Sequence, residues 1–448
     1  MHDITQEDGV ALFQKKRYAE ASEAFRQFLA QAPPPGLEAD TRRRLADALA
    51  SSGRVEEAAA ERELAANIAE ASAGDPMALM TKGDLLKRDH RHDAACVAYE
   101  QSLRLLPSQP SPGRALLMAK LALAHHDASR PAKTVIWAGA SLANKPQDAI
   151  RLMMHQMCGA GYSDLGDLER AEAHYARALA MAEAGGKAEE IAQSLTTLAS
   201  VQRKRGQFET AIGTARLAAA AFAHPGRGAP IVEAECLRDM GRFEEARAVV
   251  AAMKQGPPYD RPDVEQRTQV IIALTLAWTE AAADRPEAAL AALRGAWDGL
   301  GVSRDPPAPI LPSAHEGDKL ILYCDATAVR VYAHLGWAEG ARRMRESVEA
   351  RLGRFAQDRA GRLCVYGEFA PAALILGDYA RCHSWWQQYL DCQPDVVGQT
   401  KAHCGLGEAW SRLGDAQAAR EAFTQAVAPG INSLYARRAR ARLDELGG

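Results

Sequence analysis

Thiol and imidazole side chains gather near the end of the chain, at Cys382, His383, Cys392, His403 and Cys404. Thiolate sulfur and imidazole nitrogen are good zinc ligands, and the same two groups can form a nucleophile and its general base. Their spacing matches no zinc module, however, and no nucleophile elbow, glycine-rich phosphate loop or paired acidic motif accompanies them. We therefore expect buried core residues without metal or cofactor, and no enzyme. A metalloprotein or a hydrolase is kept as an alternative.

Composition excludes several other classes of function. The formal net charge is -3, so no global basic field exists to attract nucleic acid or anionic lipid. No N-terminal signal pattern is present, and no stretch approaches the roughly 18 consecutive apolar residues of a membrane span. The eight cysteines are scattered without a disulfide framework, as in a reducing compartment. We expect a cytoplasmic protein that binds neither nucleic acid nor membrane.

A recurring spacing of residue types indicates how the chain folds. A small residue is followed seven positions later by Gly or a polar turn residue, and five positions beyond that by Ala or another small residue. The best copies are Gly9/Lys16/Ala21, Gly83/His90/Ala95, Gly159/Gly166/Ala171 and Gly407/Gly414/Ala419. In all, the first small residue falls at 9, 46, 83, 122, 159, 199, 234, 277, 329, 370 and 407. Such a period predicts a helical solenoid, in which each helix pair packs against its neighbours.

The pattern resembles the tetratricopeptide repeat, in which a small residue is followed by an aromatic residue, then Ala, a second aromatic residue and Pro. Two nearly complete copies are Gly159, Tyr162, Gly166, Ala171, Tyr175 and Gly407, Trp410, Gly414, Ala419, Phe423. The resemblance implies an all-α, right-handed superhelix of about eleven helix pairs and a C-terminal capping helix. Most steps exceed the 34 residues of the family's usual unit, as in its long-repeat bacterial-type members.

The repeat spacing is interrupted once, in the long step from Ala277 to Val329, which contains a Pro-rich stretch at 301–319. Proline cannot continue a helix, so this stretch is either a hinge or a loop over the groove. The predicted organisation is an array of about eight repeats at 1–300, the insertion at 301–319, three repeats at 320–430 and the cap at 431–448. The register is weakest in the fourth, eighth and tenth repeats.

The resemblance also implies a binding face, because tetratricopeptide arrays usually bind through the concave face lined by the first helix of each pair. The polar candidates on that face are Arg43, Asp47, Asp84, Lys87, Arg88, Gln156, Gln193, Thr196, Ser200 and Arg203. Their amide, hydroxyl and guanidinium groups could bind a peptide backbone and its carboxylates, or could form an ordinary solvated helix face. The apolar candidates Met77, Met80 and Met153 could receive an apolar anchor or belong to the core.

These features predict a non-enzymatic scaffold or adaptor that holds a peptide or protein segment in its groove. One family subtype grips the C-terminal carboxylate of chaperones with a Lys/Asn pair on the first helices. The corresponding positions hold Arg43/Asp47, Met80/Asp84, Gln156/Ala160 and Thr196/Ser200, so a chaperone tail is not expected. The alternative is a regulatory sensor whose superhelix changes shape when it binds a peptide or small ligand.

Overall fold

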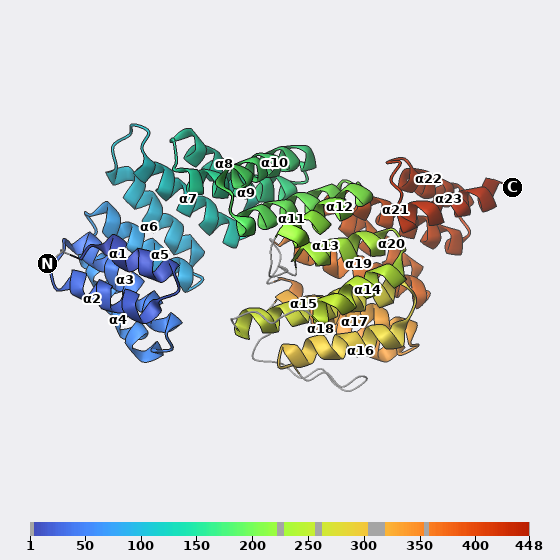
Figure 1. The fold of residues 1–448 in the computed structure, drawn as a ribbon. Helices are drawn as coiled ribbons and strands as arrows, with labels where there is room; N and C mark the ends of the chain where they lie inside the picture. Colours follow the sequence, from blue (N-terminus) through green and yellow to red (C-terminus); the bar gives the residue numbers. More distant parts are fainter. Residues whose placement is uncertain (1–3, 222–227, 256–261, 303–318, 354–357, 448) are drawn as a thin grey trace. The chain divides into compact units, whose positions relative to one another are not determined.

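The fold is all-α and consists of successive helix pairs (Figure 1). The computed structural model describes residues 4–221, 228–255, 262–302, 319–353 and 358–447. Within these ranges the chain forms 23 α-helices and no strand, which confirms the prediction of eleven pairs and one final helix. None of the described helices is both long enough and apolar enough to cross a membrane.

The first helices of the pairs are α1 (Gln6–Gln14), α3 (Pro35–Ser51), α5 (Pro76–Arg88), α7 (Pro112–Asp127), α9 (Asp148–Leu165), α11 (Ala188–Lys204), α13 (Gly228–Asp239), α15 (Pro262–Ala282), α17 (Lys319–His334), α19 (Arg359–Ile375) and α21 (Val396–Leu413). The second helices are α2 (Tyr18–Leu29), α4 (Val55–Ala71), α6 (His92–Leu105), α8 (Pro131–Ala143), α10 (Leu168–Gly185), α12 (Phe208–Ala221), α14 (Phe243–Lys254), α16 (Pro286–Gly299), α18 (Ala338–Leu352), α20 (Tyr379–Asp391) and α22 (Ala416–Val427). The chain ends with α23 (Leu434–Gly447).

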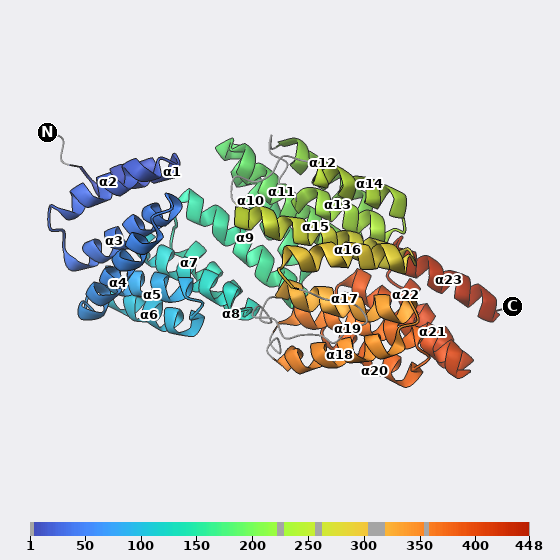
Figure 2. The same ribbon diagram turned by 90° about the horizontal axis from the view of Figure 1, so that it is seen from below.

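The chain divides into two compact units, Met1–Leu165 (unit 1) and Gly166–Gly448 (unit 2). Unit 1 contains α1 to α9, and unit 2 contains α10 to α23. In unit 2 one core cluster runs from Val270 in α15 to Ala422 in α22, along the stacked helices seen in Figure 2. Residues 303–318 lie outside the described residues, so the hinge or loop at 301–319 stays a prediction.

The recurring spacing has a structural cause at each of its three positions. The first residue is buried in all eleven pairs, from Gly9 to Gly407. The residue seven positions later has φ between 55° and 86° in every pair, which includes the weak fourth, eighth and tenth repeats. This left-handed conformation reverses the chain between the paired helices, and glycine adopts it with the least strain. The residue twelve positions after the first is also buried throughout, at no more than 1% exposure.

Glycine occupies the first position where a ring packs against it. A Cβ atom added to the glycine would lie within 3.0 Å of the ring sixteen residues later for the pairs Gly9 and Phe25, Gly83 and Tyr99, and Gly407 and Phe423. Where that later residue is small, the first position holds alanine, as for Ala122 with Ala138 and Ala199 with Ala215. In these pairs a large side chain on the second helix is matched by the smallest residue on the first, which keeps the packing dense.

His125 makes unit 1 sensitive to acid. It is 2% exposed, and its ring lies 3.8 Å from the Cys96 sulfur. Burial, assisted by the charges of Lys133 and Arg130, lowers the pKa of His125 to about 4. The unfolded chain therefore binds a proton that the folded chain does not, so stability is full above pH 6.5 and declines as the pH falls toward 4.

We expect unit 1 to lose about 3 kcal/mol across this pH range through His125. Urea unfolding at a series of pH values, followed by hydrogen exchange of α6 and α7, measures the loss. The variant His125→Leu should show a shallower decline than the native chain. An equally steep decline in both proteins would contradict the assignment.

Candidate functional site

Four of the predicted residues lie together on the first-helix side of unit 1. They belong to a concavity of about 640 Å3, here called the charged basin, which is lined by Arg43, Asp84, Lys87, Arg88, His90, His92, Lys120 and Asp127. These residues come from α3, α5, the turn after α5, the start of α6, and α7. Because the repeats stack, equivalent positions of neighbouring first helices lie side by side, and residues nearly forty apart in sequence share one surface.

Arg43 forms the centre of the basin wall. Its guanidinium lies 2.7 Å from the Asp40 carboxylate, 3.3 Å from that of Asp47 and 3.5 Å from that of Asp84. Burial alone would lower the pKa of Arg43, but the surrounding carboxylates raise it above its ordinary value. Arg43 therefore ties α3 to α5, and its charge is balanced within the fold.

Asp84 is held in place from two sides. The Tyr99 hydroxyl donates a hydrogen bond to Asp84 Oδ1 at 2.7 Å, and Lys120 Nζ donates to the same oxygen at 2.6 Å. Burial and the Asp84 charge raise the pKa of Tyr99 well above its ordinary value, which keeps the hydroxyl protonated as a donor. Because Tyr99 also fills the space beside Gly83, the core sets the position of this carboxylate.

Lys87 and Arg88 are the basin cations that are most accessible to a ligand. Their side chains are 30% and 44% exposed, and they pair with Asp127 at 3.0 Å and with Asp47, respectively. Ion pairs this exposed contribute little to stability. Lys87 and Arg88 can therefore exchange their present carboxylates for those of a ligand at small cost to the fold.

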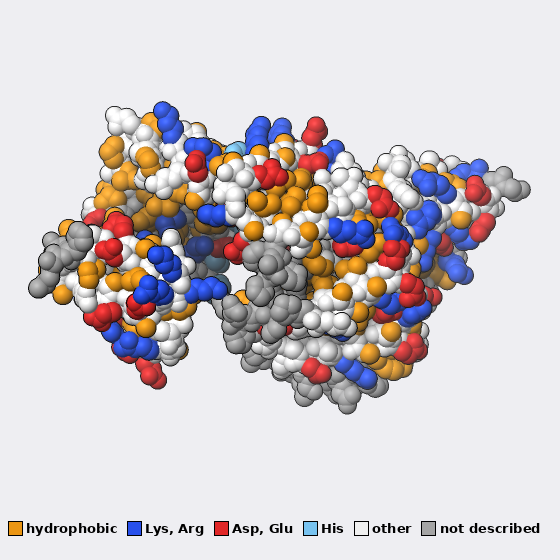
Figure 3. All heavy atoms as spheres, viewed as in Figure 1, with side chains coloured by type: hydrophobic (Ala, Val, Ile, Leu, Met, Phe, Trp, Pro, Cys, Tyr) orange, Lys and Arg blue, Asp and Glu red, His pale blue; other side chains and the backbone are white. Residues whose placement is uncertain are grey.

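The basin is lined by both positively and negatively charged side chains. Figure 3 shows Lys and Arg side chains interspersed with Asp and Glu over the visible face of unit 1.

Within the basin, Lys120, Asp127, His90 and His92 were not predicted. The His90 and His92 rings lie edge to face with their centroids 5.9 Å apart. Lys120 and Asp127 belong to the fourth repeat, one of the three repeats whose register is weakest in the sequence.

The three predicted methionines lie in different surroundings. Met77 is 38% exposed at the start of α5. Met80 packs against the core cluster that contains Tyr99, and Met153 packs against the cluster that contains Met154. Met80 and Met153 thus contact the core while they remain partly exposed, and contact of any of the three methionines with a ligand stays a prediction.

The remaining polar candidates are Gln156 on α9 and Gln193, Thr196 and Ser200 on α11, and they differ in how exposed they are. Gln156 is half-buried on α9 in unit 1. In unit 2, Gln193 is exposed, and Thr196 and Ser200 are half-buried. The Thr196 hydroxyl donates to the carbonyl of Ala192 within its own helix at 2.8 Å. A binding role for these residues stays a prediction.

Arg203 is engaged inside unit 2. Its side chain is 16% exposed and lies 2.6 Å from the Asp239 carboxylate and 3.2 Å from that of Glu235 on α13. Burial alone would lower the pKa of Arg203, but Glu235, Asp239 and Asp395 together raise it. Arg203 thus joins α11 to α13 and also lies in the field of Asp395, the residue that caps α21.

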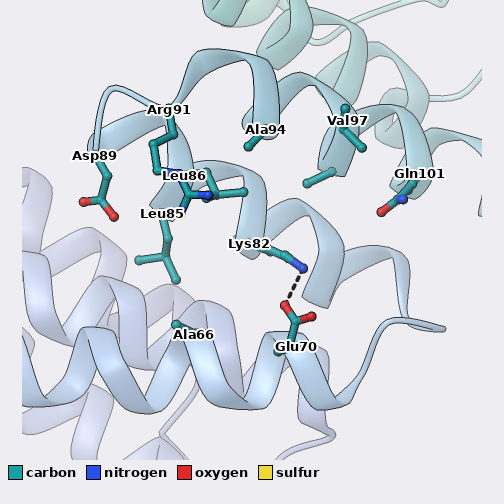
Figure 4. Close-up of a pocket in the computed structure, with 11 residues that line it drawn as sticks. Ala66, Glu70, Lys82, Leu85, Leu86, Asp89, Arg91, Ala94, Val97 and Gln101 are labelled. Atoms are coloured by element: carbon teal, nitrogen blue, oxygen red, sulfur yellow. Dashed lines mark hydrogen bonds and ion pairs between the residues drawn. The ribbon is translucent and has the colours of Figure 1, made fainter.

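A second concavity of unit 1 lies among α4, α5 and α6 (Figure 4). It encloses about 620 Å3 between α4, α5 and α6, with Leu85, Leu86 and Val97 among its apolar lining. An ion pair between Lys82 and Glu70 crosses it. None of its lining residues was among the residues predicted for the binding face.

The cysteines and histidines near the C-terminus do not form a site. Cys382, Cys392 and Cys404 are buried, and burial raises the pKa of Cys382 and Cys404 to about 12. Such thiols stay protonated, so they are poor nucleophiles and poor metal ligands. His383 packs edge to face against Trp410. The described part of the chain contains no group of three or more His, Cys, Asp or Glu residues that could hold a metal ion.

Solved structures of helical repeat proteins are similar to this chain. A Rap protein complexed with competence and sporulation factor aligns at a TM-score of 0.53 and 13% identity, over 87% of this chain and 96% of that one. Aspartyl phosphate phosphatase F from Bacillus subtilis aligns at 0.48 and 12% identity, over 77% and 92% of the two chains. A tetratricopeptide repeat protein from Parabacteroides merdae aligns at 0.40 and 13% identity, over 66% and 99%.

Comparison of the sequences alone adds no relative. No protein-family model matches the chain, and no curated protein matches it. At 13% identity, the likeness to the Rap protein concerns the fold. Together with the eleven helix pairs and their repeated turn geometry, it shows that the chain has the tetratricopeptide-like helical repeat fold.

Proposed function

We propose that this protein is a non-enzymatic scaffold or adaptor, and that it holds an extended, acidic segment of a protein partner at the charged basin of unit 1. The observation that carries the proposal is the placement of two accessible cations, Lys87 and Arg88, at the rim of a preformed concavity. Charge-assisted hydrogen bonds from these groups to carboxylates would supply orientation and affinity. The half-buried Arg43 and Asp84 would keep the rim in position.

Two further observations support a binding role. The Rap protein of the same fold was solved as a complex, with competence and sporulation factor. The proposed site also needs little rearrangement, because its wall is fixed by ion pairs among α3, α5 and α7. A preorganised surface loses less entropy on binding than a flexible one.

All eight cysteines are free, which agrees with the proposed cytoplasmic location.

The test compares charge reversal at the rim with a matched control. A library of random extended peptides is selected on the full-length protein, and affinities of the selected peptides are measured. We expect peptides rich in Asp and Glu, and we expect Lys87→Glu with Arg88→Glu to weaken binding about tenfold or more. The control is Lys82→Glu, because Lys82 lies on the same helix, is 33% exposed and also forms an ion pair.

The control should bind the selected peptides as the native protein does. The proposal would be overturned if Lys82→Glu lowered the affinity for the selected peptides equally. It would also be overturned if the charge reversal at Lys87 and Arg88 left that affinity unchanged. Far-ultraviolet circular dichroism of each variant confirms that the helices remain. Binding should also weaken as salt is raised, since the contacts are exposed charges.

A further inference from the structure

Residues near the end of the chain pack against helices much earlier in unit 2. Ile431 and Val397 belong to the same core cluster as Phe208, Leu237 and Met240. In a solenoid each repeat contacts only its neighbours. Here the sixth and seventh repeats contact the eleventh repeat and the segment that leads into α23.

Arg437 makes a specific polar contact across this junction. Its Nη2 donates a hydrogen bond at 2.6 Å to the carbonyl of Met240, a residue 197 positions earlier that follows the end of α13. Asn432 orients the same guanidinium by accepting from Nη1 at 3.0 Å. The last carbonyls of a helix lack partners within the helix, and a positive charge is favourable there. Arg437 therefore acts as a remote C-terminal cap of α13.

Two glycine turns allow the close approach. Gly206 has φ of 75°, and a Cβ atom added there would meet the Ile431 side chain within 3.0 Å. Gly241 has φ of 73°, and its added Cβ atom would lie 3.2 Å from a methyl carbon of Leu434. At both turns the arriving segment therefore contacts bare backbone. A side chain at Gly206 would clash with the segment, and one at Gly241 would crowd it.

We propose that residues 431–437, seated on the turns at Gly206 and Gly241, form a clasp that closes the repeat array of unit 2 on itself. Opening of the clasp uncovers the turns at Gly206 and Gly241. The clasp meets these turns through Ile431, Leu434 and Arg437, whereas an extended core cluster joins the helices from α15 to α22. A small contact of this kind opens at lower free energy than the helix pairs unfold.

The first test uses two glycines that occupy the same position in their repeats. Gly206 and Gly336 have φ of 75° and 74°, but nothing lies within 4 Å of a Cβ atom added to Gly336. Alanine therefore strains both backbones equally and clashes only at Gly206. In the full-length protein, we expect Gly206→Ala to speed hydrogen exchange of residues 431–437 and of the end of α11 about tenfold or more, relative to Gly336→Ala.

The second test removes the hydrogen bond without touching a turn. Arg437→Ala is compared with Arg440→Ala, because Arg440 is exposed on the same helix. A hydrogen bond from a charged group is worth about 1.5–3 kcal/mol, so exchange in the clasp should rise about 10- to 100-fold in Arg437→Ala alone. Equal exchange in the two arginine variants would overturn the proposal. So would acceleration spread evenly over all helices of unit 2, since that reports global unfolding.

Discussion

Replacing Asp325 by alanine is expected to lower the free energy of unfolding of unit 2 by about 3–5 kcal/mol. Asp325 is fully buried on α17. Its carboxylate accepts from Arg351 Nη2 at 2.7 Å and from Trp297 Nε1 at 2.9 Å. These bonds join α17 to α18 and α16. Without the carboxylate, the guanidinium of Arg351, whose side chain is 5% exposed, would stay buried with an uncompensated charge.

Urea unfolding followed by tryptophan fluorescence measures this loss, because six of the seven tryptophans lie in unit 2. The informative control replaces both charges, as Asp325→Leu with Arg351→Met. Apolar pairs of similar volume often match a buried ion pair in stability, so this double variant should recover most of the loss. A single Asp325→Ala variant within about 1 kcal/mol of the native protein would contradict the prediction.

The variant Phe423→Ala is expected to destabilise the last repeat by about 3–5 kcal/mol. Phe423 is fully buried in α22 against Gly407 of α21, in a cluster that also contains Ala439 of α23. Removal of the ring leaves a cavity that the neighbouring helices cannot fill completely. Hydrogen exchange of α21 to α23 and the urea midpoint of unit 2 together measure the effect.

The reverse change at the partner position tests the same contact from the other side. Gly407→Ala places a methyl group against the ring and should cost about 1–3 kcal/mol. When it is combined with Phe423→Leu, the smaller side chain makes room, so the double variant should be more stable than the sum of the two single effects predicts. Strict additivity would show that the two positions do not share one space.

The fold was predictable because its requirements are local. Each helix pair has a buried residue, a left-handed turn residue and a second buried residue at fixed spacing, and the first buried residue is small in every pair but the ninth, which has Val329. In three pairs the glycine at the first position makes room for a ring sixteen residues later, as at Gly83 with Tyr99. Such rules can be read within about forty residues of sequence.

The basin was predictable in part for the same reason. Arg43, Asp84 and Lys87 fall at recognisable positions of well-formed first helices, whereas Lys120 and Asp127 belong to the fourth repeat, whose register is weak in the sequence. The sequence did not distinguish accessible charges from those that the fold already balances. Both kinds have the same residue types and spacing, and only their neighbours in space separate them.

The clasp had no local signal, because it depends on how small rotations between successive repeats add up until the sixth and seventh repeats meet the eleventh. Arg203 pairs with Asp239 of the neighbouring repeat, 36 positions away, and only the packing of the two first helices shows that its charge is balanced. The buried pair of Asp325 and Arg351 was equally hidden, since charged residues 26 positions apart usually lie in solvated faces. For the two ion pairs the missing information was which side chains meet between packed helices, and for the clasp it was the three-dimensional path of many repeats.

The contact between Met240 and Arg437 also has a consequence for how the protein is made. An ordinary solenoid folds by propagation from one repeat to the next, so each repeat is complete soon after it is synthesised. A contact across 197 residues has a large loop-closure entropy and raises the contact order, which slows folding. The apolar surface of α12 and α13 that receives Ile431 stays uncovered until translation reaches the last helix. During that interval the nascent chain depends on protection from aggregation at this surface.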